Sequence, residues 1–270
     1  MQLPTLFISH GSPMYALGAD PAAGAWRDLG RELPRPRAVL VATAHWESDQ
    51  TCVGAAAQPA TIHDFGGFPA ALFRLQYPAA GAPAVAQRAA DLLAQAGLPV
   101  SLDGGRGLDH GTWAPLLHMY PQADLPVLQL SIQSHRGAAH ELAVGAALAP
   151  LADEGVLIIG SGAMTHNLVE WIGFARSHGL EPSLQPAAGY VDEFRGAIDA
   201  ALRRADTDFL AHWRERAPHA RRAHPTEEHF LPLMVAFGAA GPGAAVDRID
   251  LGVDAGVLAM DLYRFSPSVH

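Results

Sequence analysis

The 270-residue sequence contains a single cysteine, Cys52, which excludes an internal disulfide and a zinc site built from cysteines. Long hydrophobic runs are also missing, since none reaches the ~18 residues of a membrane span. Charged residues make up only 17%, with 27 acidic against 18 basic side chains and no cluster of basic residues. We therefore expect neither a membrane nor a nucleic acid among the partners of this protein.

The beginning of the chain lacks the basic segment of a secretory signal peptide, because Met1-Gln2-Leu3-Pro4 carries no charged side chain. Together with the scarcity of cysteine, this favours a protein of a reducing compartment, and we expect a cytoplasmic location. Hydrophobic residues amount to 49%, which is typical of a globular protein. No low-complexity linker divides the chain, so residues 1–270 are predicted to form a single domain.

Short apolar runs alternate along the chain with longer segments rich in alanine and leucine. Such runs are typical of strands buried on both faces, and they predict an α/β fold with a mostly parallel central sheet flanked by helices. The predicted strands are Leu3–Ile8, Ala38–Ala44, Val127–Ile132 and Val156–Gly160, with weaker candidates at Thr51–Ala57 and Pro99–Leu102. The predicted helices are Ala82–Gln95, Ala138–Asp153 and Ala187–Arg204. A final strand pair is expected from Ala245–Leu251 and Val257–Phe265, with Gly252–Gly256 as the turn.

Histidine is abundant, with 14 residues, close to the total of Lys and Arg. Three of these residues follow predicted strands, namely His10, His45 and His166. Ligands of open α/β sheets bind beyond the carboxyl ends of the strands. Any one of these histidines could be an ordinary surface residue, but three at equivalent positions predict an active site at the carboxyl ends of the strands.

Two further histidines, His63 and His110, lie in loops marked by glycine and proline. Aromatic residues accompany both: Phe65 and Phe68 follow His63, and Trp113 follows His110. Such side chains are typical of the wall of a substrate pocket for a flat ligand. The alternative is an ordinary turn with a solvated imidazole.

Another histidine, His229, lies in the segment Ala223–Leu233. Pro225 is suited to the first turn of a helix, and Glu227 is explained by the positive end of the helix dipole. His229 would then lie about one turn into this helix. Glu228 would lie ~100° away around the helix, so these two side chains cannot easily reach the same ion.

Simple motifs do not account for these histidines, because there is no H-E-x-x-H helix and Gly160-Ser161-Gly162 lacks the third glycine of a dinucleotide fingerprint. Seven blocks nevertheless occur in order: Ser-His-Gly-Ser-Pro at 9–13, Ala-His-Trp at 44–46, Thr-Ile-His-Asp-Phe-Gly-Gly-Phe-Pro at 61–69, Asp-His-Gly-Thr-Trp at 109–113, Gln-Leu-Ser-Ile at 129–132, Thr-His-Asn-Leu at 165–168 and Glu-His-Phe-Leu-Pro-Leu at 228–233. The sequence in these blocks resembles the class III extradiol ring-cleavage dioxygenases, in the subgroup of DOPA dioxygenase-like proteins. The resemblance covers nearly the whole chain.

This resemblance implies an oxidoreductase that opens the ring of a small substituted catechol with O₂. It also implies one divalent metal per chain, Fe(II) for catalysis and zinc in the isolated protein. The residues at the positions of the metal ligands are His10, His45 and His229. His166 is at the position of the acid/base histidine and could serve as a fourth ligand in a resting zinc form. His110 and His63 are at positions that hold substrate or oxygen in the pocket.

Two alternatives remain open at the level of the sequence. The wider class has a glutamate as its third ligand, where this chain has His229, and three neutral imidazoles also make a good zinc site. A zinc-dependent hydrolase on the same scaffold is therefore one alternative, and a non-catalytic metal-binding relic is another. Apart from the pocket aromatics, no residue indicates the substituent of the catechol, and the sequence specifies no oligomeric state.

Overall fold

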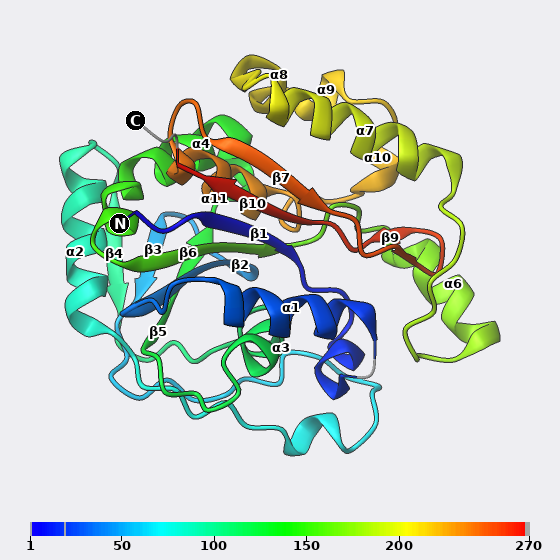
Figure 1. Cartoon of the computed structure of the whole chain (residues 1–270), viewed down its shortest axis with the longest axis horizontal. Coiled ribbons are helices and arrows are strands. Elements are labelled where there is room, and N and C mark those ends of the chain that lie inside the picture. Colours follow the sequence, from blue (N-terminus) through cyan, green and yellow to red (C-terminus); the bar gives the residue numbers. More distant parts are fainter. Residues whose placement is uncertain (1, 19, 268–270) are drawn as a thin grey trace.

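The computed structural model describes residues 2–18 and 20–267, and within them an 8-stranded sheet runs through the centre of the molecule (Figure 1). Its strands are β1 (Thr5–Ser9), β2 (Ala38–Glu47), β3 (Thr51–Gly54), β4 (Val100–Asp103), β5 (Val127–Ile132), β6 (Val156–Gly162), β7 (Ala245–Ile249) and β10 (Leu262–Ser266). Their order across the sheet is β4-β3-β5-β2-β6-β1-β10-β7. A separate hairpin pairs β8 (Val253–Asp254) with β9 (Leu258–Ala259).

The four central strands, β5, β2, β6 and β1, are parallel neighbours. On one side β10 and β7 continue the sheet with antiparallel pairing. On the other side β3 joins β5 in an antiparallel bridge and pairs with β4 in parallel. The predicted α/β class, with a mostly parallel central sheet, is confirmed.

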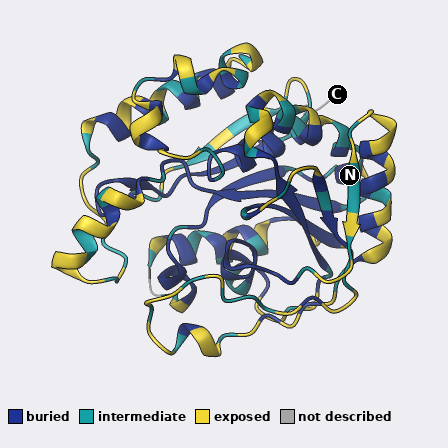
Figure 2. Ribbon diagram, turned by 180° about the vertical axis from the view of Figure 1, so that it is seen from behind, coloured by how far each residue is buried: buried dark blue, intermediate teal, exposed yellow. Residues whose placement is uncertain are grey.

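Helices cover both faces of this sheet. They are α1 (Pro21–Glu32), α2 (Pro83–Gln95), α3 (His110–Met119), α4 (Gly137–Leu148), α5 (Pro150–Asp153), α6 (Leu168–His178), α7 (Gly189–Arg203), α8 (Thr207–Ala211), α9 (Trp213–Arg216), α10 (Ala220–Ala223) and α11 (Leu231–Ala240), with 3-10 helices η1 (Pro13–Leu17), η2 (Leu72–Arg74) and η3 (Ser134–Arg136). Side chains of β1 alternate between the faces: Leu6 and Ile8 pack with α1 and α3, whereas Phe7 packs with α4 and α11. Figure 2 shows the strands buried between these two layers.

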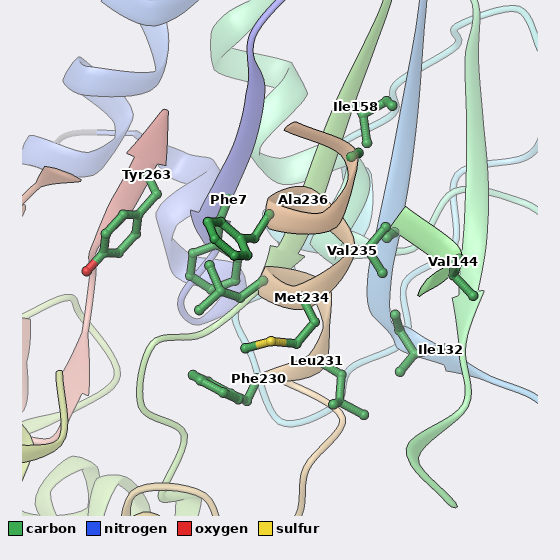
Figure 3. Close-up of a cluster of buried hydrophobic side chains, with 14 of the residues drawn as sticks. Phe7, Ile132, Val144, Ile158, Phe230, Leu231, Met234, Val235, Ala236 and Tyr263 are labelled. Carbon is green, nitrogen blue, oxygen red and sulfur yellow. The ribbon is translucent and has the colours of Figure 1, made fainter. Parts of the chain in front are cut away.

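The helix α11 lies against the sheet and against α4. Its sequence carries no charged or hydrogen-bonding side chain, and Leu231, Met234 and Val235 are fully buried. A helix that is apolar on all sides is typical of a protein core. Figure 3 shows its side chains between Phe7 of β1 and Val144 of α4. This burial anchors the residue just before the helix, at the edge of the sheet where the parallel strands end.

Two expected elements differ in the structure. The helix predicted over Ala138–Asp153 is divided into α4 and α5 at Pro150, because proline has no N–H and its ring collides with the carbonyl of the preceding turn. The terminal strand pair is present as β7 and β10, but the β8–β9 hairpin lies between them in place of a simple turn. Among the described residues, no helix combines the length and the hydrophobicity needed to cross a membrane.

The helix expected to begin near Pro225 begins instead at Leu231. Residues 225–230 form bends and turns, so His229 precedes the helix rather than lying one turn into it. The backbone carbonyl of His229 accepts a hydrogen bond of 2.8 Å from the N–H of Ala163, which ties this segment to the end of β6. Pro232, in the first turn of α11, suits a helix start at Leu231.

Candidate functional site

Five histidines line one cavity at the carboxyl ends of the parallel strands: His10, His45, His110, His166 and His229. His10 directly follows β1, and His45 lies in β2, which continues to Glu47 rather than ending at Ala44. His110 is the first residue of α3, and His166 follows β6. The cavity has a volume of about 380 Å³, at the small end of ligand-binding pockets.

The three histidines predicted as metal ligands lie together. The ring centroid of His10 is 5.0 Å from that of His45 and 5.5 Å from that of His229, and the last two centroids are 4.9 Å apart. The distances between possible ligand atoms group these residues differently from the ring centroids. One group is His10, His45 and His110, and the other is His166, Glu228 and His229. Within each group the donor atoms lie within 4.8 Å of one another.

The Nε2 atoms of His10 and His45 are 3.0 Å apart. Two neutral imidazole nitrogens that both present lone pairs repel each other, unless a cation or a proton lies between them. Two nitrogens that each lie ~2.1 Å from one ion at right angles would be ~3.0 Å apart. This pair therefore fits a shared divalent metal.

Carboxylates face the Nδ1 atoms of both His45 and His229. Nδ1 of His45 lies 3.3 Å from a carboxylate oxygen of Asp64, and Nδ1 of His229 lies 2.8 Å from Oε1 of Glu228. A carboxylate only accepts hydrogen bonds, so the proton of His229 is assigned to Nδ1, and the nearby Asp64 carboxylate favours a proton on Nδ1 of His45 as well. Nε2 then carries the free lone pair, as in the carboxylate–histidine–metal arrangements of metalloproteins.

His10 reaches the same tautomer through a hydroxyl group. Its Nδ1 lies 3.0 Å from Oγ of Ser161, and that hydroxyl donates its own proton to the backbone carbonyl of Gly111. The Ser161 oxygen must therefore accept from His10, which leaves Nε2 of His10 with its lone pair. All three predicted ligands thus present Nε2.

Asp64 holds two rings of the cluster at once. One carboxylate oxygen faces His45, and the other accepts from Nδ1 of His110 at 3.0 Å and from its backbone N–H at 2.9 Å. Burial would raise the pKa of Asp64, but hydrogen bonding to His110 and the charges of His110 and His45 outweigh it and keep this pKa well below its usual range. Asp64 is therefore an ionised acceptor under neutral conditions.

Burial keeps the clustered imidazoles neutral. It lowers the pKa of His10 and of His229 well below the usual value, and neighbouring histidines lower both further. The same causes bring the pKa of His45 to about 3 and that of His166 to about 4. Metal ligands must be deprotonated, so this donor set is ready to bind a cation at neutral pH. The chemistry and geometry of these residues fit a divalent metal.

Two glycines of β6 explain how His229 comes so close to the strand. A Cβ atom on Gly162 would lie 2.1 Å from the backbone oxygen of His229, and one on Gly160 would lie 2.0 Å from that of Pro232. Any larger residue would displace the start of α11. The glycines of Gly160-Ser161-Gly162 therefore serve close backbone approach, while the serine between them orients His10.

The structure separates the predicted pocket aromatics into two pairs. Phe65 and Phe68 line the cavity, and the Phe65 ring meets that of His110 edge-on at 5.5 Å. His63 and Trp113, expected in the pocket wall, do not line it. Nε2 of His63 lies 3.0 Å from the carbonyl of Leu75, and both rings pack against Phe65 from behind, with centroids 5.8 and 6.2 Å away. Aromatic residues near a histidine in the sequence indicate a pocket wall. They do not indicate whether a given ring faces the cavity or packs behind the wall.

Sequence reasoning missed the acceptors behind the histidines. Asp64, Ser161 and Glu228 each orient a predicted ligand. Asp64 stands next to His63 in one of the histidine-containing blocks, which was the available signal. The expectation that Glu228 and His229 cannot easily reach one ion assumed a helix, but this segment is a turn, and the donor atoms of His166, Glu228 and His229 lie within 4.8 Å of one another. The turn also lets Glu228 face Nδ1 of His229 as an acceptor.

The comparisons with known proteins identify the family. Residues 4–249 match the model described as the catalytic LigB subunit of aromatic ring-opening dioxygenase. The chain belongs to the LigB family. It is 42% identical over 266 residues to 4,5-DOPA dioxygenase extradiol of Beta vulgaris, with 97% of this chain and 96% of that protein covered. The protein of the same name from Escherichia coli K12 is 39% identical, with 96% and 93% covered.

A solved structure agrees with the LigB assignment. The crystal structure of an uncharacterized Escherichia coli K12 protein superposes with a TM-score of 0.77 at 34% identity, covering 97% of this chain and 99% of that one. The predicted resemblance and enzyme class, a ring-cleavage dioxygenase and hence an oxidoreductase, are confirmed. LigB dioxygenases depend on a metal, and the histidine cluster is where this LigB protein could hold one.

Proposed function

We propose that this protein is an extradiol dioxygenase that opens a DOPA-like or other small substituted catechol with O₂, and that residues 1–270 form one catalytic domain. In this proposal His10, His45 and His229 hold one divalent metal per chain. The observation that supports the assignment is the common orientation of these three rings, each with Nδ1 facing an oxygen and Nε2 directed elsewhere. The names of the relatives, 4,5-DOPA dioxygenase extradiol, support the reaction class.

We assign Fe(II) to catalysis and zinc to the protein isolated in air. When bound, the metal supplies a centre that brings catechol and O₂ together in one oriented complex. Three protein ligands would leave coordination positions of such a metal open to both reactants. Fe(II) lies below zinc in the usual affinity order, and three imidazoles suit either ion, so zinc can displace iron during overproduction.

His166 is the acid/base residue in this mechanism. Burial holds its pKa at about 4, so the ring is neutral at pH 7 and can accept a proton from a catechol hydroxyl. Its ring faces that of His229 at 3.4 Å, which places it beside a proposed ligand. The same imidazole can return the proton at a later step.

His110 and the aromatic wall position the substrate. Nδ1 of His110 donates to Asp64, so its Nε2 is the acceptor available to a substrate hydroxyl. Phe65 and Phe68 offer ring faces and edges to the flat catechol. His63 and Trp113 act indirectly, because they support Phe65 from behind.

Metal exchange tests this proposal. Protein purified in air should contain zinc and be nearly inactive, because zinc has no redox chemistry. Anaerobic replacement by Fe(II), followed by oxygenated buffer and a catechol, should give O₂ uptake and a yellow ring-cleavage product. If the zinc form hydrolyses an ester or amide without O₂ and the iron form never consumes O₂, the protein is a zinc hydrolase. If neither form turns over any of these substrates, the site is a non-catalytic relic.

A further inference from the structure

Hydrogen bonds join the two segments that carry His166 and His229. The N–H of Ala163 donates to the carbonyl of His229 at 2.8 Å, and the N–H of His166 donates to the carbonyl of Ala223 at 2.7 Å. The loop after β6 therefore runs beside the segment that leads from α10 to α11. Because the stack of His166 on His229 is formed between these segments, it depends on how they are held together.

His224 adds a side chain to this connection. Its Nε2 lies 2.9 Å from the backbone carbonyl of Met164, two residues before His166. A carbonyl oxygen only accepts hydrogen bonds, so Nε2 carries the proton of this ring. The N–H of Met164 donates to Oγ of Ser9 at 3.0 Å, at the end of β1 and next to His10. Met164 is thus held between β1 and His224.

The surroundings of His224 would suit an apolar ring better than an imidazole. The side chain is fully buried, and the ring centroids of Phe194, Trp213 and Phe230 lie 5.5, 5.6 and 5.1 Å from its own. Nδ1 is buried and has no partner among the described residues. A buried nitrogen without a partner costs stability, and a phenyl ring would avoid that cost. What the imidazole adds is the hydrogen bond to Met164.

We propose that His224 is a positioning residue, whose hydrogen bond to Met164 holds His166 where it exchanges a proton with the substrate. This inference rests on the acid/base role proposed for His166. His224 does not line the cavity, so it acts on the reaction only through His166. Without its bond, the Met164 carbonyl is a buried acceptor that lacks a donor, and the loop must move to satisfy it. A displacement of about 1 Å in a catalytic group can lower a rate about 100-fold.

Two substitutions of His224 separate the hydrogen bond from the packing. His224→Phe keeps a ring among the aromatic side chains and removes the donor. His224→Gln keeps a donor, because its amide NH₂ can take the place of the imidazole N–H. With the Fe(II)-loaded protein and a catechol, kcat should fall about 10–100-fold in His224→Phe, and His224→Gln should recover most of this loss. KM and zinc content should change little, because His229 is tied to Ala163 through its own carbonyl.

Crystal structures of the zinc-loaded variants measure the position of His166 without turnover. His224→Phe should displace the His166 ring from its stack on His229, where the centroids are 3.4 Å apart, and His224→Gln should retain the stack. The control is His212→Phe, which removes a hydrogen bond of 2.9 Å between an exposed imidazole and the carbonyl of Asp208. This control should change neither kcat nor the stack.

The outcomes separate this inference from the proposed function. Thermal unfolding verifies that the variants fold, and His224→Met, with a flexible apolar side chain, replaces His224→Phe if that variant does not. The inference is overturned if His224→Phe keeps the kcat or the stack, if His224→Gln loses as much as His224→Phe, or if neither apolar variant folds. His224 would then serve packing or stability alone. If the unaltered Fe(II) protein consumes no catechol, the proposed function fails, while the crystal structures still test whether His224 holds His166.

Discussion

The imidazole rings of His166 and His229 lie face to face, with centroids 3.4 Å apart and planes 11° from parallel. Nδ1 of His229 lies 2.8 Å from Glu228, which leaves Nε2 as the other ring nitrogen of His229. The rings of His229 and His166 line the same cavity. In the proposed site, a ring stacked on the ligand His229 would be near enough to exchange a proton with a bound substrate without binding the ion itself. On this basis we expect His166 and His45 to have different roles.

Substitution of these two histidines should have different consequences. His45→Ala should abolish both metal retention and turnover, because it removes a nitrogen 3.0 Å from that of His10. His166→Ala should retain the metal and lose about 10²–10⁴ in rate, the usual contribution of a positioned acid/base group. Metal content by mass spectrometry and kcat with a catechol are the two measurements. Equal metal loss in both variants would make His166 a fourth ligand.

The third metal ligand can be identified by comparing His229 with His110. Both rings lie in the cavity, and the donor atoms of His110 form the tighter group with His10 and His45. We expect His229→Ala to lose the metal and His110→Ala to retain it while KM for catechols rises. Zinc stoichiometry after dialysis measures this directly. Loss of zinc in His110→Ala together with retention in His229→Ala would make His10, His45 and His110 the ligand set.

The sequence predicted those parts of the site that depend on local pattern. His10 and His45 follow apolar runs, and the parallel strands carry them to one edge of the sheet, as expected. Buried parallel strands are recognisable because their apolar runs are continuous. The limits of β2 were less predictable, since this strand continues past His45 through an irregular register between Ala42 and Glu47.

Contacts between distant segments could not be predicted in the same way. The position of His229 depends on Gly162 and Ala163 of another segment, which tie the turn before α11 to β6. The bridging role of Asp64 depends on His45 and His110, 19 and 46 residues away along the chain. No periodicity or spacing in the sequence indicates these contacts, because tertiary packing alone decides which loops lie together.

The bridging carboxylate predicts a specific effect on metal affinity. Asp64→Asn replaces two acceptor oxygens by one, so His45 or His110 must face an amide NH₂ group. If that ring is His45, its Nδ1 becomes the acceptor and the proton moves to Nε2, which then cannot bind the metal. We expect metal affinity to fall by about 10–100-fold, the usual effect of losing such an acceptor.

Chelator competition with zinc measures this change in affinity. The control is Glu193→Gln, which removes a carboxylate from the exposed surface of α7, where its partner is His219. An Asp64→Asn variant with the affinity of the control would show that Asp64 does not orient the ligands.

The buried carboxyl of Glu141 should make the stability of the folded protein depend on pH. This fully buried residue of α4 accepts a hydrogen bond from the N–H of Gln133 at 2.7 Å through Oε1. Burial raises its pKa from 4.5 to about 7, against smaller opposing effects of Gln133 and Arg136. Between these values the unfolded chain loses the proton while the folded chain keeps it. Stability should therefore fall as pH rises from about 4.5 to about 7, by an amount on the order of 3 kcal/mol from this group.

The Glu141→Gln variant isolates this contribution, because an amide stays neutral at every pH and its oxygen can still accept from Gln133. The difference in the free energy of unfolding between pH 5 and pH 8, measured with urea, should be smaller in Glu141→Gln than in the unaltered protein. Glu181→Gln, at an exposed position, is the control for removing one carboxylate and should leave that difference unchanged. If Glu141→Gln and Glu181→Gln show the same pH dependence, Glu141 is ionised in the folded protein and burial does not hold its proton.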